Sequence, residues 1–304
     1  MLIDLRSAVI LLSLVGIILM GSLTIYSVTS IDIYYFLRFL AINIFAIVLV
    51  TLFFYQINLN RILSFGWLFF LGNILLVLSV EIIGKEVNGA QRWLDFGFLS
   101  LQPTEFMKIA YPLFAIQYLR FYSFQFNPFR SYFLLGTLFL SSIPIIIQPD
   151  LGTGLVYILS GLMLLFICGL DRRYFIGMGA FAILFSPIIY NFGLTNYQKG
   201  RIISWFSSDQ TLSEKWNILQ SEISIGSGGI VGEGFLNSKQ NEFNFLPEAD
   251  TDFIFSIYAE QFGFIGVFFI FLLLAIFIVF TTLFSMTEKR LTDDLSPYYL
   301  GTYF

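Results

Sequence analysis

Long apolar stretches constrain this chain more than any other feature of its sequence. Eight runs of spanning length fall at about 7–27, 35–55, 62–80, 105–122, 131–148, 153–170, 174–193 and 253–285. A bilayer core takes about 20 apolar residues of helix, and backbone in hydrocarbon has to satisfy its own hydrogen bonds. The pattern therefore predicts an all-α, polytopic transmembrane helical protein with about eight spans.

Composition also points to a lipid environment. The chain has 304 residues, of which 57% are hydrophobic and 12% charged, and its mean hydropathy is +0.82. Soluble domains are typically about 45–50% apolar and about 25% charged, so a soluble fold of this length would lack polar cover. The run 7–27 is too long for a signal-peptide core and no small-residue cleavage pattern follows it, so we expect it to be the first span.

Charge and residue usage exclude several classes of function. The net charge is −4, which gives no electrostatic footprint for a nucleic-acid partner. The chain has no histidine, so His-triad hydrolases, His-ligated zinc sites and histidine proton relays are excluded. The single cysteine, Cys168, lies within an apolar run and is interpreted as a small buried hydrophobe. Neither GxxxxGK[ST] nor GxGxxG is present, and we expect no nucleotide, flavin or haem.

Lysine and arginine in the short loops predict the orientation of the chain. The outer short loops carry only Lys85 and Arg92 if the N-terminus is cytoplasmic. The inner loops then carry Arg6, Arg61, Arg120, Arg130, Arg172, Arg173, Lys289 and Arg290. We therefore expect a multi-pass protein with a cytoplasmic N-terminus, and with the segments 82–104 and 194–252 outside.

The outer segment 194–252 is the longest loop and contains the glycine-rich stretch GSGGIVGEG (226–234). Loops longer than about 12–15 residues are usually functional or disordered. This one keeps too many large apolar residues for a disordered linker, so we expect it to fold back onto the outer ends of the helices. No internal repeat or second soluble domain is evident, and residues 1–304 are expected to form one integral membrane domain.

Ionisable groups at membrane depth are costly, so each is a candidate for function. Glu105 and Lys108 lie three apart on one helix face, either as a structural ion pair or with the lysine held toward a cavity. Gln148 and Asp150 close the fifth span, where they could line a site or form a turn in which the aspartate caps the next helix.

Four acids precede the eighth span, and they form the densest cluster of charge in the chain. They could belong to a solvated loop end, or they could form a site in which like charges repel one another. The acids are Glu242, Glu248, Asp250 and Asp252.

Three segments together resemble a known family. They are NGAQRWLDFGFLSLQPTEFMKIA (88–110), IIQPDLGTGLVYI (146–158), and the region 219–266, which contains LQSEISIGSGGIVGEGF and FNFLPEADTDFIFSIYAEQFGFIG. Their order, spacing and place at the outer membrane ends are similar to the signature regions of the SEDS proteins (shape, elongation, division and sporulation). The motifs NILQS and FNFLPE favour the RodA-like branch of that family, which implies a role in cell-wall elongation and cell-shape maintenance.

The resemblance implies an activity, partners and a location. SEDS proteins are polytopic glycosyltransferases of the bacterial plasma membrane, which polymerise lipid II into the glycan strands of peptidoglycan during cell-wall elongation or division. They work with a class B penicillin-binding protein, a transpeptidase, and with other proteins of the elongation or division complex. The family motif T-D-F-I-F makes Asp252 the essential acid. The positions that the resemblance assigns to substrate binding are Arg92, Glu105, Lys108, Arg201 and Glu248.

Two departures from the family pattern stand out. The family usually has histidine where this chain has Asp250, so a like charge lies two residues from Asp252. The family normally has ten spans, and the last two have no counterpart here, as expected either of a truncated member or of a divergent eight-span form.

The residues are compatible with this chemistry. Lipid II polymerisation joins a sugar hydroxyl to the anomeric carbon of a sugar that carries a lipid diphosphate, which is already a good leaving group. One general base, Asp252, and positive charge from Lys108, Arg92 and Arg201 then suffice, and a divalent cation (Mg²⁺ or Mn²⁺) could assist at the diphosphate. The alternatives are a flippase or transporter of lipid-linked precursors, and a non-catalytic scaffold of a wall-synthesis complex.

Overall fold

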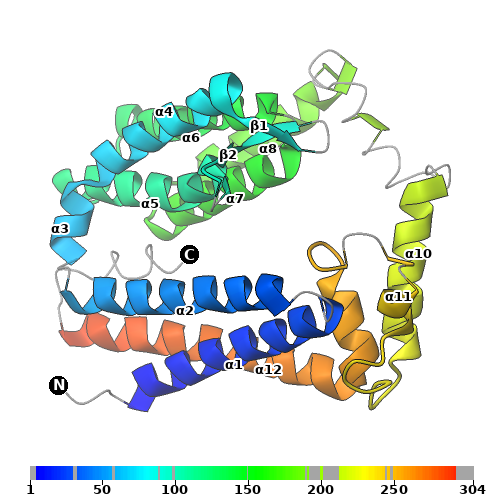
Figure 1. Ribbon diagram of the computed structural model, residues 1–304. Coiled ribbons are helices and arrows are strands. Elements are labelled where there is room, and N and C mark those ends of the chain that lie inside the picture. The colour runs from blue at the N-terminus through cyan, green and yellow to red at the C-terminus, as the bar shows by residue number, and fades with distance from the viewer. Residues whose placement is uncertain are drawn as a thin grey trace. The chain divides into compact units, whose positions relative to one another are not determined.

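The chain folds mainly as helices, with one small sheet, in a computed structural model (Figure 1). The structure describes residues 5–29, 33–56, 59–87, 90–97, 100–148, 150–188, 190–191, 199–200, 212–243, 245–246 and 249–291. These residues fall into two compact units, one from Met1–Gln56 with Ser207–Glu288 and the other from Ile57–Phe206 with Lys289–Phe304. The expectation of one membrane domain over residues 1–304 stays a prediction.

The first unit joins the N-terminal helices to the chain that leads into the last one. Its helices are α1 (Leu5–Val28), α2 (Ile33–Gln56), α10 (Leu212–Ser227), α11 (Lys239–Glu242) and α12 (Ile254–Leu291). Tyr26 of α1 meets Phe36 of α2 edge to face at 5.0 Å between ring centroids. The amide of Gln261 in α12 donates a hydrogen bond to the Ser27 hydroxyl of α1. Side-chain contacts and hydrogen bonds therefore hold α1 to both partners.

The helix α12 is interrupted at Gly263, where φ is 62° and ψ is −164°. This backbone conformation strongly favours glycine, because it lies in the left-handed half of the φ range. A break frees backbone donors and acceptors that would otherwise pair within the helix. The glycine-rich stretch supplies the missing partners, and α12 therefore consists of two shorter helices joined at a supported break.

The second unit carries the remaining elements, a group of packed helices and one small sheet. They are α3 (Leu59–Ser64), α4 (Gly66–Ile83), β1 (Lys85–Val87), β2 (Ala90–Asp95), β3 (Ser100–Leu101), α5 (Pro103–Phe121), α6 (Pro128–Ile147), α7 (Leu151–Ile167) and α8 (Arg172–Ile188). The strands pair antiparallel in the order β1-β2-β3. β2 lies against α4 and α5.

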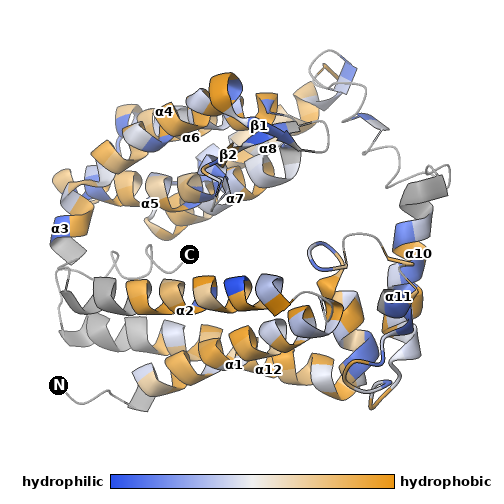
Figure 2. Cartoon of the chain, viewed as in Figure 1, coloured by the Kyte–Doolittle hydropathy of each residue, from blue (hydrophilic) through white to orange (hydrophobic). Residues whose placement is uncertain are grey.

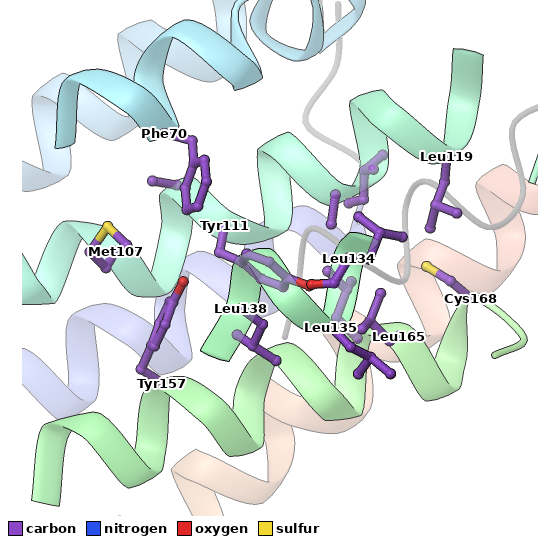
Figure 3. Packing of buried hydrophobic residues seen from close by; sticks show 14 of the residues in the cluster. Phe70, Met107, Tyr111, Leu119, Leu134, Leu135, Leu138, Tyr157, Leu165 and Cys168 are labelled. Atoms are coloured by element: carbon purple, nitrogen blue, oxygen red, sulfur yellow. The ribbon is translucent and has the colours of Figure 1, made fainter. Parts of the chain in front are cut away.

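The core of the second unit lies where α4, α5, α6 and α7 meet, and Figure 3 shows its centre. The Tyr111 hydroxyl donates to the Leu134 carbonyl at 2.9 Å, so this fully buried phenol has a partner. Tyr157 shares a hydrogen bond of 2.6 Å with the Ser141 hydroxyl. A Cβ on Gly161 would lie 2.5 Å from Leu138, so α7 can approach α6 only because that residue is glycine. The core therefore holds α5 and α7 in fixed relation.

Helices occur at all eight intervals that the sequence predicts as spans, which confirms a polytopic helical membrane fold. Among the described residues, four helices are long and apolar enough to cross a bilayer: Ser7–Val28, Gly66–Ile83, Pro128–Ile147 and Ile254–Leu283. Ile33–Leu49 and Gly152–Ile167 are shorter apolar helices. Figure 2 shows α1 and α12 as largely hydrophobic, whereas hydrophilic residues are concentrated on α11 and parts of α10.

Two local features differ from the expectation. The third predicted span is divided at Phe65 into α3 and α4, and a Cβ on Gly66 would come within 2.6 Å of the Leu113 carbonyl of α5. The outer segment 82–104, expected as a loop, contains the three strands. These strands have 3, 6 and 2 residues, too short for an alternating pattern to indicate them in the sequence.

Candidate functional site

Asp252 lies in the turn that leads directly into α12, at the start of the apolar segment Ile254–Leu283. Its side chain is exposed, and within the described part of the chain its carboxylate forms no ion pair. The N-terminal end of a helix carries partial positive charge, which favours a carboxylate beside it. An exposed, unpaired carboxylate at the end of a span is free to accept a proton from a bound molecule.

The other acids of this cluster have different surroundings. Asp250 is half-buried and accepts a hydrogen bond of 3.4 Å from the Tyr35 hydroxyl of α2. Glu242 closes the short helix α11, and Glu248 lies outside the described residues. Asp250 is thus tied to the helix bundle, whereas Asp252, two residues further on, is not.

Packing fixes the turn that carries these acids. Leu246 and Ala249 are buried against Ile257 of α12, with Phe253 packed beside them. The Trp216 indole of α10 donates to the Phe245 carbonyl at 3.1 Å. The turn before α12 therefore rests on the start of α12 and on α10, which gives Asp252 a defined position.

Glu260 is a further acid in the first unit, and the sequence analysis did not single it out. It lies on α12 eight residues after Asp252 and is 1% exposed. Its carboxylate accepts hydrogen bonds from Ser224, Ser238 and the backbone of Lys239, among others. An acid within an apolar run was the available signal, because insertion scales put the cost of such a group at about 2.5–3.5 kcal/mol.

The glycine-rich stretch is interlocked with the break in α12. The Phe264 and Ile265 amides donate to the carbonyls of Gly229 and Ile230, at 2.9 and 3.1 Å. In the other direction, the Glu233 and Gly234 amides donate to the carbonyls of Glu260 and Gln261. The groups freed by the break are thus paired. A Cβ on Gly232 would lie 2.1 Å from the Gln261 carbonyl, which explains the need for glycine.

Glu105 and Lys108 lie in the first turns of α5, in the second unit. Their charged atoms are 2.7 Å apart, with the lysine side chain 29% exposed and the glutamate 51%. The predicted pairing on one helix face is therefore present. The glutamate restrains the lysine ammonium group, which stays partly exposed to solvent. The geometry therefore fits a structural ion pair, and it equally fits a positioned cation that a ligand can reach.

Arg92 lies on β2, and its guanidinium is 3.8 Å from the Asp150 carboxylate. The same carboxylate oxygen accepts a hydrogen bond of 2.9 Å from the Gln102 side chain. Its other oxygen accepts from the Thr153 amide at 3.2 Å and so caps α7. Asp150 therefore acts as a helix cap, one of the two possibilities for its position, and also joins the sheet to the ends of α5 and α7.

Two buried side-chain amides stabilise the region where β2, α5 and α7 meet. The Asn73 side chain of α4 donates to the Pro103 carbonyl at 3.2 Å, at the first residue of α5. The Gln148 side chain donates to the Val77 carbonyl at 2.9 Å. Both amides are buried, so α4 holds the start of α5 and the end of α6 through specific polar contacts.

The structure does not test two of the predicted features, the role of Arg201 and the divalent cation. Arg201 lies outside the described residues. Among the described residues, no group of three or more histidine, cysteine, aspartate or glutamate side chains could hold a metal ion. A divalent cation at the diphosphate therefore stays a prediction.

A family model described as "Cell cycle protein", which covers FtsW, RodA and SpoVE, matches residues 4–295. The chain belongs to the FtsW/RodA/SpoVE family. The match includes both units and every candidate residue named above. The sequence resemblance is thereby confirmed at the level of the family.

Curated relatives of this FtsW/RodA/SpoVE chain carry names of enzymes. It is 38% identical over 208 residues to "Peptidoglycan glycosyltransferase MrdB" of Escherichia coli (strain K12), covering 68% of this chain and 55% of that protein. It is 32% identical over 281 residues to "Probable peptidoglycan glycosyltransferase FtsW" of Buchnera aphidicola subsp. Schizaphis graminum, covering 89% and 75%. The chain spans about half the length of the MrdB relatives it matches.

Solved structures share the fold of this family member. A chain of a peptidoglycan synthase complex aligns with a TM-score of 0.72 and 22% identity, covering 96% of this chain and 82% of that chain. The rod shape determining protein RodA of Thermus thermophilus aligns with a TM-score of 0.63 and 22% identity, covering 96% and 79%. At this identity the likeness establishes the fold.

Proposed function

We propose that this chain is a peptidoglycan glycosyltransferase that polymerises lipid II into glycan strands during cell-wall elongation and cell-shape maintenance, in the RodA-like branch of its family. The observation that carries the proposal is the family match over residues 4–295, which includes an exposed carboxylate, Asp252, at the start of the α12 span. The names of the MrdB and FtsW relatives support the same reaction.

In the proposed reaction Asp252 acts as the general base. Its carboxylate takes the proton of the acceptor sugar hydroxyl as that oxygen forms a bond to the anomeric carbon of the donor sugar. The bond from that carbon to the diphosphate oxygen breaks, and the lipid diphosphate leaves with the electron pair. A positioned base contributes about 10²–10⁴ in rate. Direct attack on an α-linked donor inverts the linkage to β.

In this proposal the positive charge for the leaving group comes from residues that the family resemblance assigns to substrate binding. Lys108 is restrained by Glu105, and Arg92 is restrained by Asp150, so neither cation has to be ordered when the diphosphate binds. Arg201 and Glu248 keep the substrate-binding roles that the resemblance implies. A divalent cation, Mg²⁺ or Mn²⁺, would neutralise further charge on the diphosphate.

The decisive experiment is incubation of the purified protein, at its full natural length, with lipid II, with and without a class B penicillin-binding protein. Glycan polymer resolved on a gel is the expected result. A transporter of lipid-linked precursors would move lipid II between leaflets of a vesicle without forming polymer, and a scaffold would do neither. Absence of polymer under both conditions would reject the proposal.

The partner belongs to the proposal as well. A similar chain belongs to a peptidoglycan synthase complex that coordinates polymerization and crosslinking, and this supports a transpeptidase partner here. We expect a class B penicillin-binding protein with one span to co-purify in detergent, while an unrelated single-span protein does not. Equal recovery of the two would contradict a specific complex.

A further inference from the structure

Glu260 is a buried acid with no role in the mechanism above. It is 1% exposed, and it lies within Ile254–Leu283, the most apolar helical segment that the structure describes. An ionisable side chain at such a place is costly to insert, and an aliphatic residue would cost less. Its presence requires a role that offsets that cost.

The carboxylate of Glu260 is surrounded by four neutral donors. One oxygen accepts from the hydroxyls of Ser224, at 3.1 Å, and Ser238, at 2.5 Å. The other oxygen accepts from the backbone amides of Lys239, at 2.9 Å, and Gln240, at 3.4 Å. Hydrogen bonds to a charged acceptor are stronger than neutral ones, so this group ties two pieces of chain, α10 and residues 238–240, to α12.

These bonds close a loop. Gln240 is held to Glu260, and α12 begins at Ile254, so the stretch 241–253 starts and ends on the same helix. This stretch carries Asp252. Closing a loop of this length restricts the positions that its residues can adopt. Leu246 and Ala249 then pack on Ile257 and complete the attachment.

We propose that Glu260 is a positioning residue for Asp252: its carboxylate fastens the start of the loop 241–253 to α12 and so holds the general base in its reactive position. This inference rests on the proposed function. A general base has to be held within hydrogen-bond reach of the proton it removes, and loss of that geometry lowers the turnover rate more than it lowers substrate binding.

Three variants of the full-length protein test the proposal. Glu260→Ala removes all four bonds. Glu260→Gln keeps the acceptor for the two amides and offers a donor to the two hydroxyls, which can rotate to accept. Glu222→Gln removes an acid from an exposed position on α10 and is the matched control.

The first readout is hydrogen exchange of the Lys239 and Gln240 amides in detergent, followed by mass spectrometry, with peptides of α5 to α7 as internal reference. We expect exchange in Glu260→Ala to be faster by about 10-fold or more, an intermediate change in Glu260→Gln, and no change in the control. This readout does not depend on any activity. Unchanged exchange in Glu260→Ala would overturn the loop attachment.

The second readout is polymerisation of lipid II by the same three proteins. We expect kcat to fall by about 10- to 100-fold in Glu260→Ala, with KM within about twofold of the parent and partial recovery in Glu260→Gln. A Glu260→Ala protein with faster exchange and unchanged kcat would overturn the positioning role. If Glu260→Ala does not accumulate, Glu260→Gln carries both measurements, and unchanged exchange and kcat in that variant would also count against the proposal.

The two proposals fail in different ways. If the parent protein forms no polymer, the proposed function is rejected, whereas the exchange measurement still decides whether Glu260 fastens the loop. If the parent is active and Glu260→Ala alone has normal kcat, the positioning role is rejected and the proposed function stands.

Discussion

Asp252 differs from the acids near it because its carboxylate is exposed and has no bonding partner among the described residues. Asp250 is bonded to Tyr35 and Glu260 is enclosed by donors, whereas the Asp252 side chain is exposed and unpaired among the described residues. A structural acid is usually paired or hydrogen-bonded when it lies at a membrane boundary. The contrast supports Asp252 as the group that acts on a substrate.

Replacing Asp252 by asparagine should abolish the proposed reaction. The substitution Asp252→Asn keeps the size and hydrogen-bonding capacity of the side chain but removes the base, so we expect lipid II polymerisation to fall by about 10²–10⁴-fold. Expression and membrane insertion should be normal, because the side chain makes no ion pair in the described part of the chain. Gel analysis of glycan products from the full-length protein is the measurement.

Asp171→Asn is the matched control for that variant. Asp171 is an exposed aspartate that accepts from the Arg173 amide, and asparagine can accept the same bond. Activity of the control should equal that of the parent. A rate for Asp252→Asn within a few-fold of the parent would show that another group is the base.

At the scale of the elements, Asp150 has two structural roles, a helix cap and an ion pair, and mutation can separate them. Its Oδ1 caps α7, while its Oδ2 meets Gln102 and Arg92. Asparagine caps a helix nearly as well as aspartate, whereas alanine does not.

We therefore expect Asp150→Ala to lose about 1–2 kcal/mol of stability and Asp150→Asn much less. Both variants should weaken the restraint on Arg92, because both lack the negative charge. Thermal unfolding in detergent gives the stabilities, and the lipid II assay gives the activities. Equal stability of the two variants would contradict the cap, and full activity of Asp150→Asn would contradict a role for its charge.

The contact between the glycine-rich stretch 226–234 and the break in α12 can also be tested with a pair of matched variants. Gly232 and Gly229 both have positive φ, but a Cβ on Gly232 meets the Gln261 carbonyl at 2.1 Å and one on Gly229 meets nothing within 4 Å. Gly232→Ala should cost about 2–5 kcal/mol from strain and overlap together, and Gly229→Ala about 1–2 kcal/mol from strain alone. Melting curves of the two variants compared with the parent provide the measurement. A smaller loss for Gly232→Ala than for Gly229→Ala would disprove the interlock.

At the scale of the whole molecule, the orientation in the membrane is open to direct test. The distribution of lysine and arginine predicts that 171–173 is cytoplasmic and that the segment 194–252 is outside. In a Cys168→Ala background, a cysteine at Asn237 should react with an impermeant thiol reagent added to intact cells, and one at Arg172 should not. Both positions are exposed, so access is limited only by the membrane. The reverse pattern would invert the topology.

Much of the helical architecture could be predicted because a bilayer imposes a length and a composition on each span. The Glu105–Lys108 pair could be predicted for a similar reason, since residues three apart on a helix are neighbours whatever surrounds them. The family resemblance placed Asp252 beside the last described span, because the motif and the span are adjacent in the chain. Each of these inferences rests on local information.

What the tertiary structure alone revealed depends on residues far apart in the chain. Arg92 meets Asp150 across 58 positions, a separation that no periodicity encodes. In the sequence Glu260 is an acid within an apolar run, and only the tertiary contacts with residues 224 and 238–240 show that it is enclosed by donors. The break at Gly263 likewise follows from the backbone of the glycine-rich stretch, because a helix can be opened in an apolar setting only where another segment satisfies its freed groups.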